Sequence, residues 1–136
     1  MTDKLTSGVH HIGLTVPDID QARAFFCGVL GFDEVGGMPD YPSIFVSDGV
    51  ILLTLWRAAD PLTARAFDRR ANIGLHHLSL AVSDDAALET VWEKVRAHSE
   101  VVIDSAPSPI RPGSRTRHFL VFIPGGIRIE FATPFV

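Results

Sequence analysis

The stretch VHHIGLTVPD at residues 9–18 returns 66 positions later as LHHLSLAVSD at residues 75–84. Five of the ten positions are identical, including both histidines and the closing aspartate. Each copy alternates apolar and polar residues over its middle, which is typical of a β-strand with one buried face. The chain is therefore predicted to contain two copies of one structural module, each beginning with a strand.

Each copy continues into a helical pattern and then into short apolar runs. Apolar residues recur at three- and four-residue steps over 18–30 and 84–99, and an Asp begins each segment as a candidate N-cap. Each module is thus predicted as β-α-β-β-β, with module one at about residues 8–57 and module two at about 74–134. The connector, about residues 58–73, contains the helix-start signal Asp60-Pro61 and is expected to hold a short helix. The later strands are expected at 33–36, 43–47 and 50–56 in module one, and at 101–104, 117–123 and 127–132 in module two.

Composition places the chain among single-domain globular proteins. It has 136 residues, of which 46% are hydrophobic, and area scaling lets roughly two-thirds of its surface leave water. Twelve Lys and Arg against sixteen Asp and Glu give a formal charge of −4, without the basic cluster that nucleic-acid binding requires. No apolar stretch approaches the roughly 20 residues that span a bilayer, and no signal peptide is evident. With Cys27 as its only cysteine, the chain is expected to be one cytoplasmic α+β domain covering residues 1–136.

Strand alternation indicates which way the histidines face. Successive side chains of a strand point to opposite faces, and the apolar face must pack on the helices. Alternation along the two first strands assigns His10 and His76 to the apolar faces, and His11 and His77 to the opposite faces. In the last strand the apolar residues alternate with Glu130, which joins His11 and His77 on one surface.

Two imidazoles and one carboxylate on one surface form a plausible divalent-metal site. This set of ligands leaves coordination positions open for a substrate and suits a borderline cation. Each of these residues alone is more commonly solvated or hydrogen-bonded. Here, however, the alternation patterns of three separate strands place all three residues on the same surface. We therefore predict that His11, His77 and Glu130 hold one divalent ion (Fe, Ni, Zn or Mn), and that Glu130 is also catalytic.

Five segments in this order carry a resemblance to a known family: HIGLTVPD (11–18), AFF (24–26), VLGF (29–32), HLSLAV (77–82) and PGGIRIE (124–130). Together they resemble the vicinal oxygen chelate superfamily. Its members include glyoxalase I, fosfomycin-thiol transferases, methylmalonyl-CoA epimerase, extradiol dioxygenases and bleomycin-resistance proteins.

The resemblance implies a fold, a metal site and a partner. Its fold consists of two βαβββ modules that curl into a U-shaped half-barrel sheet around a metal, with helices packed outside. The family's ligand positions fall on His11, His77 and Glu130. A homodimer is expected, because a half-barrel leaves strand edges for a partner to cover. In such dimers His11 can come from one chain and His77 with Glu130 from the other, although the three can also meet within one chain.

One departure from the family pattern concerns a fourth metal ligand, usually Glu or Gln late in module one. Aligning Gly49 with Gly126 gives Leu53 the position that corresponds to Glu130, and a shift of one gives Leu52. No carboxylate, amide or histidine occurs in the seven residues after Gly49. We expect a three-ligand site with Leu53 facing the substrate, and weak or absent glyoxalase activity because a metal-bound base is missing.

The segment 111–117 offers arginines for an anionic substrate. Arg115 and Arg117 lie amid Pro and Gly, and guanidinium groups hydrogen-bond carboxylates and phosphonates in a two-pronged way. We predict that this segment is a mobile lid in which Arg115 and Arg117 bind a small anionic molecule.

Aromatic and histidine residues supply further candidates. Trp56, with Phe45 and Tyr41, could line the site and stack on a planar substrate, although packing in the core is an equal expectation. His118 or His98 could serve as the acid–base histidine of a dioxygenase. An outward strand face for His118 and a helix end for His98 are the simpler expectations.

These observations predict a metal-dependent enzyme that acts on a small oxygen-chelating metabolite. Its reaction is left open between a lyase or isomerase of glyoxalase type and a ring-cleaving dioxygenase. A fosfomycin-type thiol transferase and a non-catalytic drug-binding resistance protein are the alternatives. Retention of His11, His77 and Glu130 argues against the last, because a sequestering groove does not need them.

Overall fold

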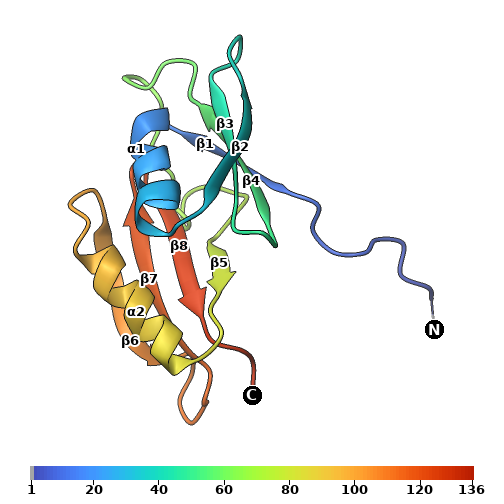
Figure 1. Ribbon diagram of the computed structural model, residues 1–136, viewed down its shortest axis with the longest axis vertical. Coiled ribbons are helices and arrows are strands. Elements are labelled where there is room, and N and C mark those ends of the chain that lie inside the picture. The colour runs from blue at the N-terminus through green and yellow to red at the C-terminus, as the bar shows by residue number, and fades with distance from the viewer. Residues whose placement is uncertain (1) are drawn as a thin grey trace.

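Two βαβββ units follow one another in the computed structural model, which describes residues 2–136 (Figure 1). Module one contains β1 (Ile12–Val16), α1 (Ile19–Arg23) running directly into the π-helix η1 (Ala24–Val29), β2 (Asp33–Met38), β3 (Ser43–Ser47) and β4 (Leu52–Arg57). Module two contains β5 (Leu78–Ala81), α2 (Asp85–Arg96), β6 (Val102–Pro109), β7 (Arg117–Ile123) and β8 (Ile127–Ala132). The predicted α+β class and the repeated module are confirmed.

Each module folds its four strands into a separate sheet with the same topology. Sheet one has the order β1-β4-β3-β2 and sheet two the order β5-β8-β7-β6. The first strand of each module pairs in parallel with the last, whereas the other pairs are antiparallel. As a result, β1 and β5 are both edge strands, and each has one side without a ladder partner among residues 2–136.

The helices begin where the sequence predicts. The Asp18 carboxylate accepts a hydrogen bond from the Gln21 amide at 2.9 Å, and the Asp84 carboxylate accepts one from Ala87 at 2.8 Å. Gly31, with φ of +79°, follows the first helix in the left-handed conformation that ends many helices. The second helix ends at Arg96, three residues before the predicted limit of 99. No helix within residues 2–136 is long and apolar enough to cross a membrane.

The helices cover one face of each sheet and thereby define the core. In Figure 1, α2 lies over β6 and β7, and α1 lies against sheet one near the upper ends of β7 and β8. Phe25, Phe26 and Phe119 are almost fully buried, together with the apolar phase of every central strand. The opposite faces have no helix over them. We call these the open faces: Gly13, Thr15, Phe45, Thr54 and Trp56 on sheet one, and Ser79, His118, Leu120, Phe122, Arg128 and Glu130 on sheet two.

The connector does not contain the predicted helix. Residues 61–63 form a turn in which Asp60 accepts bonds from Leu62 and Ala64, but the turn is not continued. Instead the Phe67 amide donates to the Gly125 carbonyl at 2.7 Å, which holds the connector against the β7–β8 turn. Gly126, with φ of +80°, lies so close to Phe67 that a Cβ would stand 2.6 Å from its carbonyl oxygen. The connector is thus fixed by a long-range contact that the local helix signal does not reveal.

Candidate metal centre

His77 and Glu130 form the centre of a polar cluster on the open face of sheet two. Ser79, two residues after His77, lies opposite Glu130 across the β5–β8 ladder. This register brings His77 Nε2 to 3.7 Å from Glu130 Oε1. The Glu130 side chain is only 9% exposed, whereas that of His77 is 35% exposed and therefore reachable from outside. The predicted proximity of these two residues holds in the structure.

His118 also contacts Glu130, contrary to the expectation of an outward position. Its Nδ1 lies 2.7 Å from Glu130 Oε2, and its side chain is 16% exposed. Alternation within β7 could have revealed this, because Phe119 and Val121 take the core phase and leave His118 on the open face. His98, by contrast, lies at the end of α2 as expected, with its ring 6.3 Å from that of Phe25.

Opposing effects set the charge state of Glu130. Burial raises the pKa of the carboxyl, but hydrogen bonds from His118 and Ser79, together with the charges of His77 and His118, outweigh it. The net effect lowers the pKa of Glu130 below its ordinary value. The group is therefore a carboxylate at neutral pH, the form that can bind a cation.

His11 lies apart from this cluster, on the exposed segment just before β1. Over residues 2–136, no three His, Cys, Asp or Glu side chains converge closely enough to hold one ion. In Figure 1 the segment that leads into β1 projects away from both modules. The chain therefore brings together two of the three predicted donors, and His11 is not the third within one copy.

Both doubled histidines adopt the same local geometry. His10 Nδ1 lies 2.9 Å from His11 Nδ1, and His76 Nδ1 lies 2.8 Å from His77 Nδ1. Each pair of rings meets edge to face, with centroids 5.1 Å apart. His10 and His76 are exposed, so the expectation that they share the buried face is wrong; both pairs precede the first paired strand residue, where alternation does not yet apply.

The charges around His76 favour its neutral form. Desolvation lowers the pKa of His76, and the charges of His77, Arg128 and Arg69 lower it further. Two arginines therefore lie near the histidine pair of module two.

The donors present suit a divalent cation. Two ligand atoms, each about 2.1 Å from one tetrahedral ion, stand about 3.4 Å apart. The 3.7 Å between His77 Nε2 and Glu130 Oε1 is close to this spacing. Imidazole nitrogen and carboxylate oxygen are also a common pair around zinc, nickel and ferrous iron. The two residues can hold a metal that has other ligands supplied from elsewhere.

The position equivalent to Glu130 in module one is Thr54. Glu130 lies opposite Ser79, and the residue 66 positions before Ser79 is Gly13, which lies opposite Thr54. Leu53 is fully buried in the core, so its predicted place facing the substrate is wrong.

The reason for this error lies in the turns before the last strands. Gly49 matches Gly125, both with φ of +94°, rather than the adjacent Gly126 that the sequence alignment used. The absence of a fourth carboxylate ligand is unaffected, because Thr54 offers only a hydroxyl. That hydroxyl accepts a hydrogen bond from Trp56 Nε1 at 2.9 Å.

An aromatic cluster occupies the open face of sheet one. Trp56 is half-buried, and its ring meets Tyr41 at 4.8 Å and Phe45 at 5.8 Å between centroids. Gly13 leaves room for it, because a Cβ there would lie 3.6 Å from Trp56 Nε1 and 3.2 Å from the Thr54 hydroxyl. These rings lie on the open face of sheet one, and not in the core.

The predicted arginine lid is a closed hairpin. The Ile110 amide donates to the Thr116 carbonyl at 2.8 Å, which closes the loop between β6 and β7. Arg115 is exposed in this loop, and its substrate-binding role stays a prediction. Arg117 begins β7 and points to α2, where Nη1 lies 3.4 Å from Glu89 Oε1. It therefore lies on the helix side of the sheet rather than on the open face.

Two other arginines lie on the side of sheet two that carries the donor pair. Arg128, two residues before Glu130, donates from Nε and Nη2 to Asp104 at 2.9 and 2.8 Å. Arg69 from the connector places its guanidinium carbon 5.9 Å from the Phe122 ring centroid, and Phe122 pairs with Arg128 across the β7–β8 ladder. The phase of β8 already indicated the position of Arg128, but no local pattern marks Arg69.

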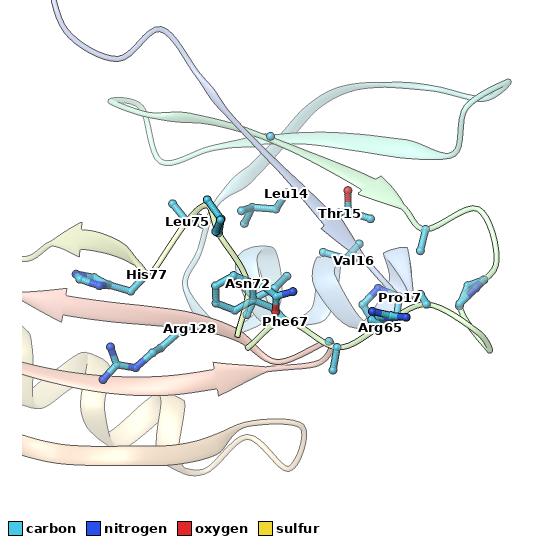
Figure 2. Close-up of a pocket in the computed structure, with 18 residues that line it drawn as sticks. Leu14, Thr15, Val16, Pro17, Arg65, Phe67, Asn72, Leu75, His77 and Arg128 are labelled. Atoms are coloured by element: carbon cyan, nitrogen blue, oxygen red, sulfur yellow. The ribbon is translucent and has the colours of Figure 1, made fainter. Parts of the chain in front are cut away.

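A cavity of about 540 Å³ opens between the two modules and the connector. Figure 2 shows His77 and Arg128 at one end of it, Arg65 toward the other, and Asn72 and Phe67 between them. Its volume lies within the range of small-molecule sites, and apolar side chains form most of its wall. The cavity thus extends from the donor His77 along the seam between the modules.

Comparisons with known proteins agree with this architecture. The family model described as Glyoxalase/Bleomycin resistance protein/Dioxygenase superfamily matches residues 8–131. A 2-epi-5-epi-valiolone epimerase from an Actinomyces species is 30% identical over 93% of this chain and 73% of its own length. The catechol-2,3-dioxygenase of Bacillus subtilis (strain 168) is 31% identical over 76% of this chain, which spans 36% of that protein. A glyoxylase/bleomycin resistance protein/dioxygenase domain from Frankia sp. EAN1pec has the same fold, with a TM-score of 0.79, 22% identity, and coverage of 94% of this chain and 98% of that one.

Proposed function

Because the chain belongs to the Glyoxalase/Bleomycin resistance protein/Dioxygenase superfamily, we propose that it is a divalent-metal-dependent enzyme acting on a small oxygen-chelating metabolite. The observation that carries this proposal is the pair formed by His77 Nε2 and Glu130 Oε1, 3.7 Å apart on an open sheet face. A carboxylate this well buried, beside a reachable imidazole, is an arrangement that a cation stabilises.

The third donor of the proposed site is His11 of a second copy of the chain. His11 is exposed and forms no metal-binding group with Glu130 among the described residues, and within that part of the chain the edge strands β1 and β5 each have an unpaired side. A homodimer that places β1 of one chain beside β5 of the other would cover these edges. It would also bring the aromatic cluster around Trp56 opposite the donor pair of the partner.

The bound cation would supply Lewis-acid polarisation of a substrate oxygen. Glu130 holds its negative charge in place through the His118 contact, and it is our candidate for the catalytic residue as well as a ligand. The rings of Trp56 and Tyr41 offer a stacking surface that excludes water from a planar substrate. Thr54 supplies no carboxylate for proton abstraction, so glyoxalase turnover is expected to be weak.

The substrate class is proposed to be anionic. Arg128 stands two residues from Glu130 on the same face, about 7 Å along the strand. Arg69 lies next to it over Phe122 and has no carboxylate partner among the ion pairs of residues 2–136. A carboxylate or phosphonate held by Arg69 and Arg128 would leave the other end of a short substrate at the donor pair.

Isomerisation is the favoured reaction, and ring-cleaving dioxygenation is the second candidate. The epimerase relative covers nearly the whole chain, whereas the dioxygenase relative is a longer protein matched over about a third of its length. Thiol transfer and non-catalytic drug binding are the remaining alternatives.

Metal content of protein purified without added metal or chelator tests the proposal. We expect one ion per chain in the wild type, almost none in His77→Ala, and full content in the control His98→Gln, which alters a histidine at the end of α2. Iron together with oxygen uptake on a catechol that carries a carboxylate would favour the dioxygenase. Another metal, without oxygen uptake on that compound, would favour the isomerase. A wild-type protein that neither contains nor takes up a stoichiometric divalent ion would refute the proposal.

A further inference from the structure

The two doubled histidines share a contact that ordinary strand geometry forbids. Adjacent side chains of a strand point to opposite faces, yet the Nδ1 atoms of each pair are within 2.9 Å. The contact forms because His10 and His11 precede Ile12, and His76 and His77 precede Leu78, where the ladders begin. The same arrangement occurs in both modules, 66 residues apart, with interplanar angles of 79° and 76°.

A short contact between two ring nitrogens requires that one carries a hydrogen and the other does not. If His77 donates from Nδ1, its Nε2 has a free lone pair. If His76 donates instead, His77 carries its hydrogen on Nε2. That nitrogen lies 3.7 Å from Glu130 Oε1, which is too far for a hydrogen bond that would hold an Nε2 hydrogen in place. The contact itself allows both arrangements. A cation bound at Nε2 requires the first one, in which His77 donates from Nδ1 to His76.

We propose that His10 and His76 are positioning residues, whose Nδ1 atoms accept hydrogen bonds that fix the tautomer and orientation of His11 and His77. This inference rests on the proposed metal site, because a free Nε2 lone pair is what a cation needs. Metal-binding histidines usually donate their second ring N–H to an oxygen acceptor or water. Here the acceptor is the imidazole of the preceding histidine, and the same arrangement occurs in each module.

The tautomer can be read directly in metal-free protein. Long-range ¹H–¹⁵N correlation spectra at pH 8 are expected to show His77 with its hydrogen on Nδ1, the minor tautomer of a free histidine. His76→Phe removes the acceptor and is expected to return His77 to the Nε2–H form. His76→Asn places an amide oxygen near the lost Nδ1 and is expected to retain the Nδ1–H form. A wild-type His77 with its hydrogen on Nε2 would overturn the inference.

Zinc titration supplies the second readout. We expect His76→Phe to weaken Zn²⁺ binding about 10- to 100-fold and His76→Asn to stay within about threefold of the wild type. The corresponding changes at His10 should act on His11 in the same way, and they serve as a repeat if a His76 variant folds poorly. Equal zinc affinity in wild type and His76→Phe would overturn the inference. A wild type that binds no zinc would instead refute the proposed function, while the tautomer spectra would still judge this proposal.

Discussion

Replacing Gly126 with alanine tests whether the connector is held by the β7–β8 turn. Gly126 has φ of +80°, and a Cβ there would lie 2.6 Å from the Phe67 carbonyl oxygen. The matched control is Gly113→Ala, because Gly113 has nearly the same φ, +82°, and no atom within 4 Å of the added Cβ. Both variants place an alanine in the left-handed conformation, which costs roughly 1–2 kcal/mol, and both restrict the unfolded chain equally.

The additional cost at Gly126 comes from displacing Phe67. Ordinary contact begins at 3.4 Å, so the carbonyl must move by the difference from 2.6 Å, 0.8 Å. This movement strains the bond from Phe67 N to Gly125 O, worth about 0.5–1.5 kcal/mol, and adds overpacking of about 1–3 kcal/mol. We expect Gly126→Ala to lower the free energy of unfolding by about 2–4 kcal/mol more than Gly113→Ala.

Urea unfolding followed by circular dichroism measures this difference. With a slope of about 2 kcal/mol per molar urea, the midpoint of Gly126→Ala should lie about 1–2 M below that of Gly113→Ala. All proteins should be compared at one concentration, since dimerisation would stabilise them by mass action. Equal midpoints for the two variants would show that the contact between Phe67 and the turn does not hold the connector.

Three further predictions concern the site and its surroundings. Thr54→Glu should tighten Zn²⁺ binding about tenfold or more by adding a carboxylate at the position equivalent to Glu130, whereas Leu53→Glu should destabilise the fold by roughly 3–5 kcal/mol as an unpaired buried charge. Tighter zinc binding by Leu53→Glu, together with destabilisation by Thr54→Glu in urea unfolding, would contradict the assignment of Thr54 to the position of Glu130. Burial raises the pKa of the Cys27 thiol, so iodoacetamide at pH 8 should modify the native protein about tenfold more slowly than the urea-unfolded chain; equal rates by mass spectrometry would contradict this. Arg69→Ala should raise KM for an anionic substrate with metal content unchanged, while Arg115→Ala should have the smaller effect; a wild-type KM in Arg69→Ala would show that Arg69 does not bind the substrate.

The sequence was sufficient for those features that depend on local periodicity. An Asp before each amphipathic segment correctly predicted the caps Asp18 and Asp84. Alternation correctly placed Glu130 on the open face of β8, where the side chain of His77 also lies close to it. Leu53 was misplaced because Gly49 can be aligned with either Gly125 or Gly126, and the sequence does not distinguish the two. Choosing the wrong glycine shifts the alignment by one residue, which moves every side chain to the other face of the strand.

Long-range contacts account for the remaining differences. Asp60 begins a turn that is not continued as a helix, and a few residues later the connector is bonded through Phe67 to Gly125. Arg69 lies 53 positions before Phe122 in the sequence, and only the folded connector brings the two together. The contact between His76 and His77 depends on where the ladder begins, which is a property of strand pairing rather than of composition.

Subunit complementation tests the shared metal site most directly. His11→Ala and His77→Ala proteins are each expected to bind no stoichiometric zinc, because each lacks one donor in every site. When the two are unfolded together and refolded, a mixed dimer has one site that retains His11 from one chain with His77 and Glu130 from the other. Statistical mixing should then restore about one tight zinc site for every four chains. No recovery, although mixed dimers are present by native mass spectrometry, would contradict a site built from two chains, as would a wild-type monomer that binds one zinc ion tightly.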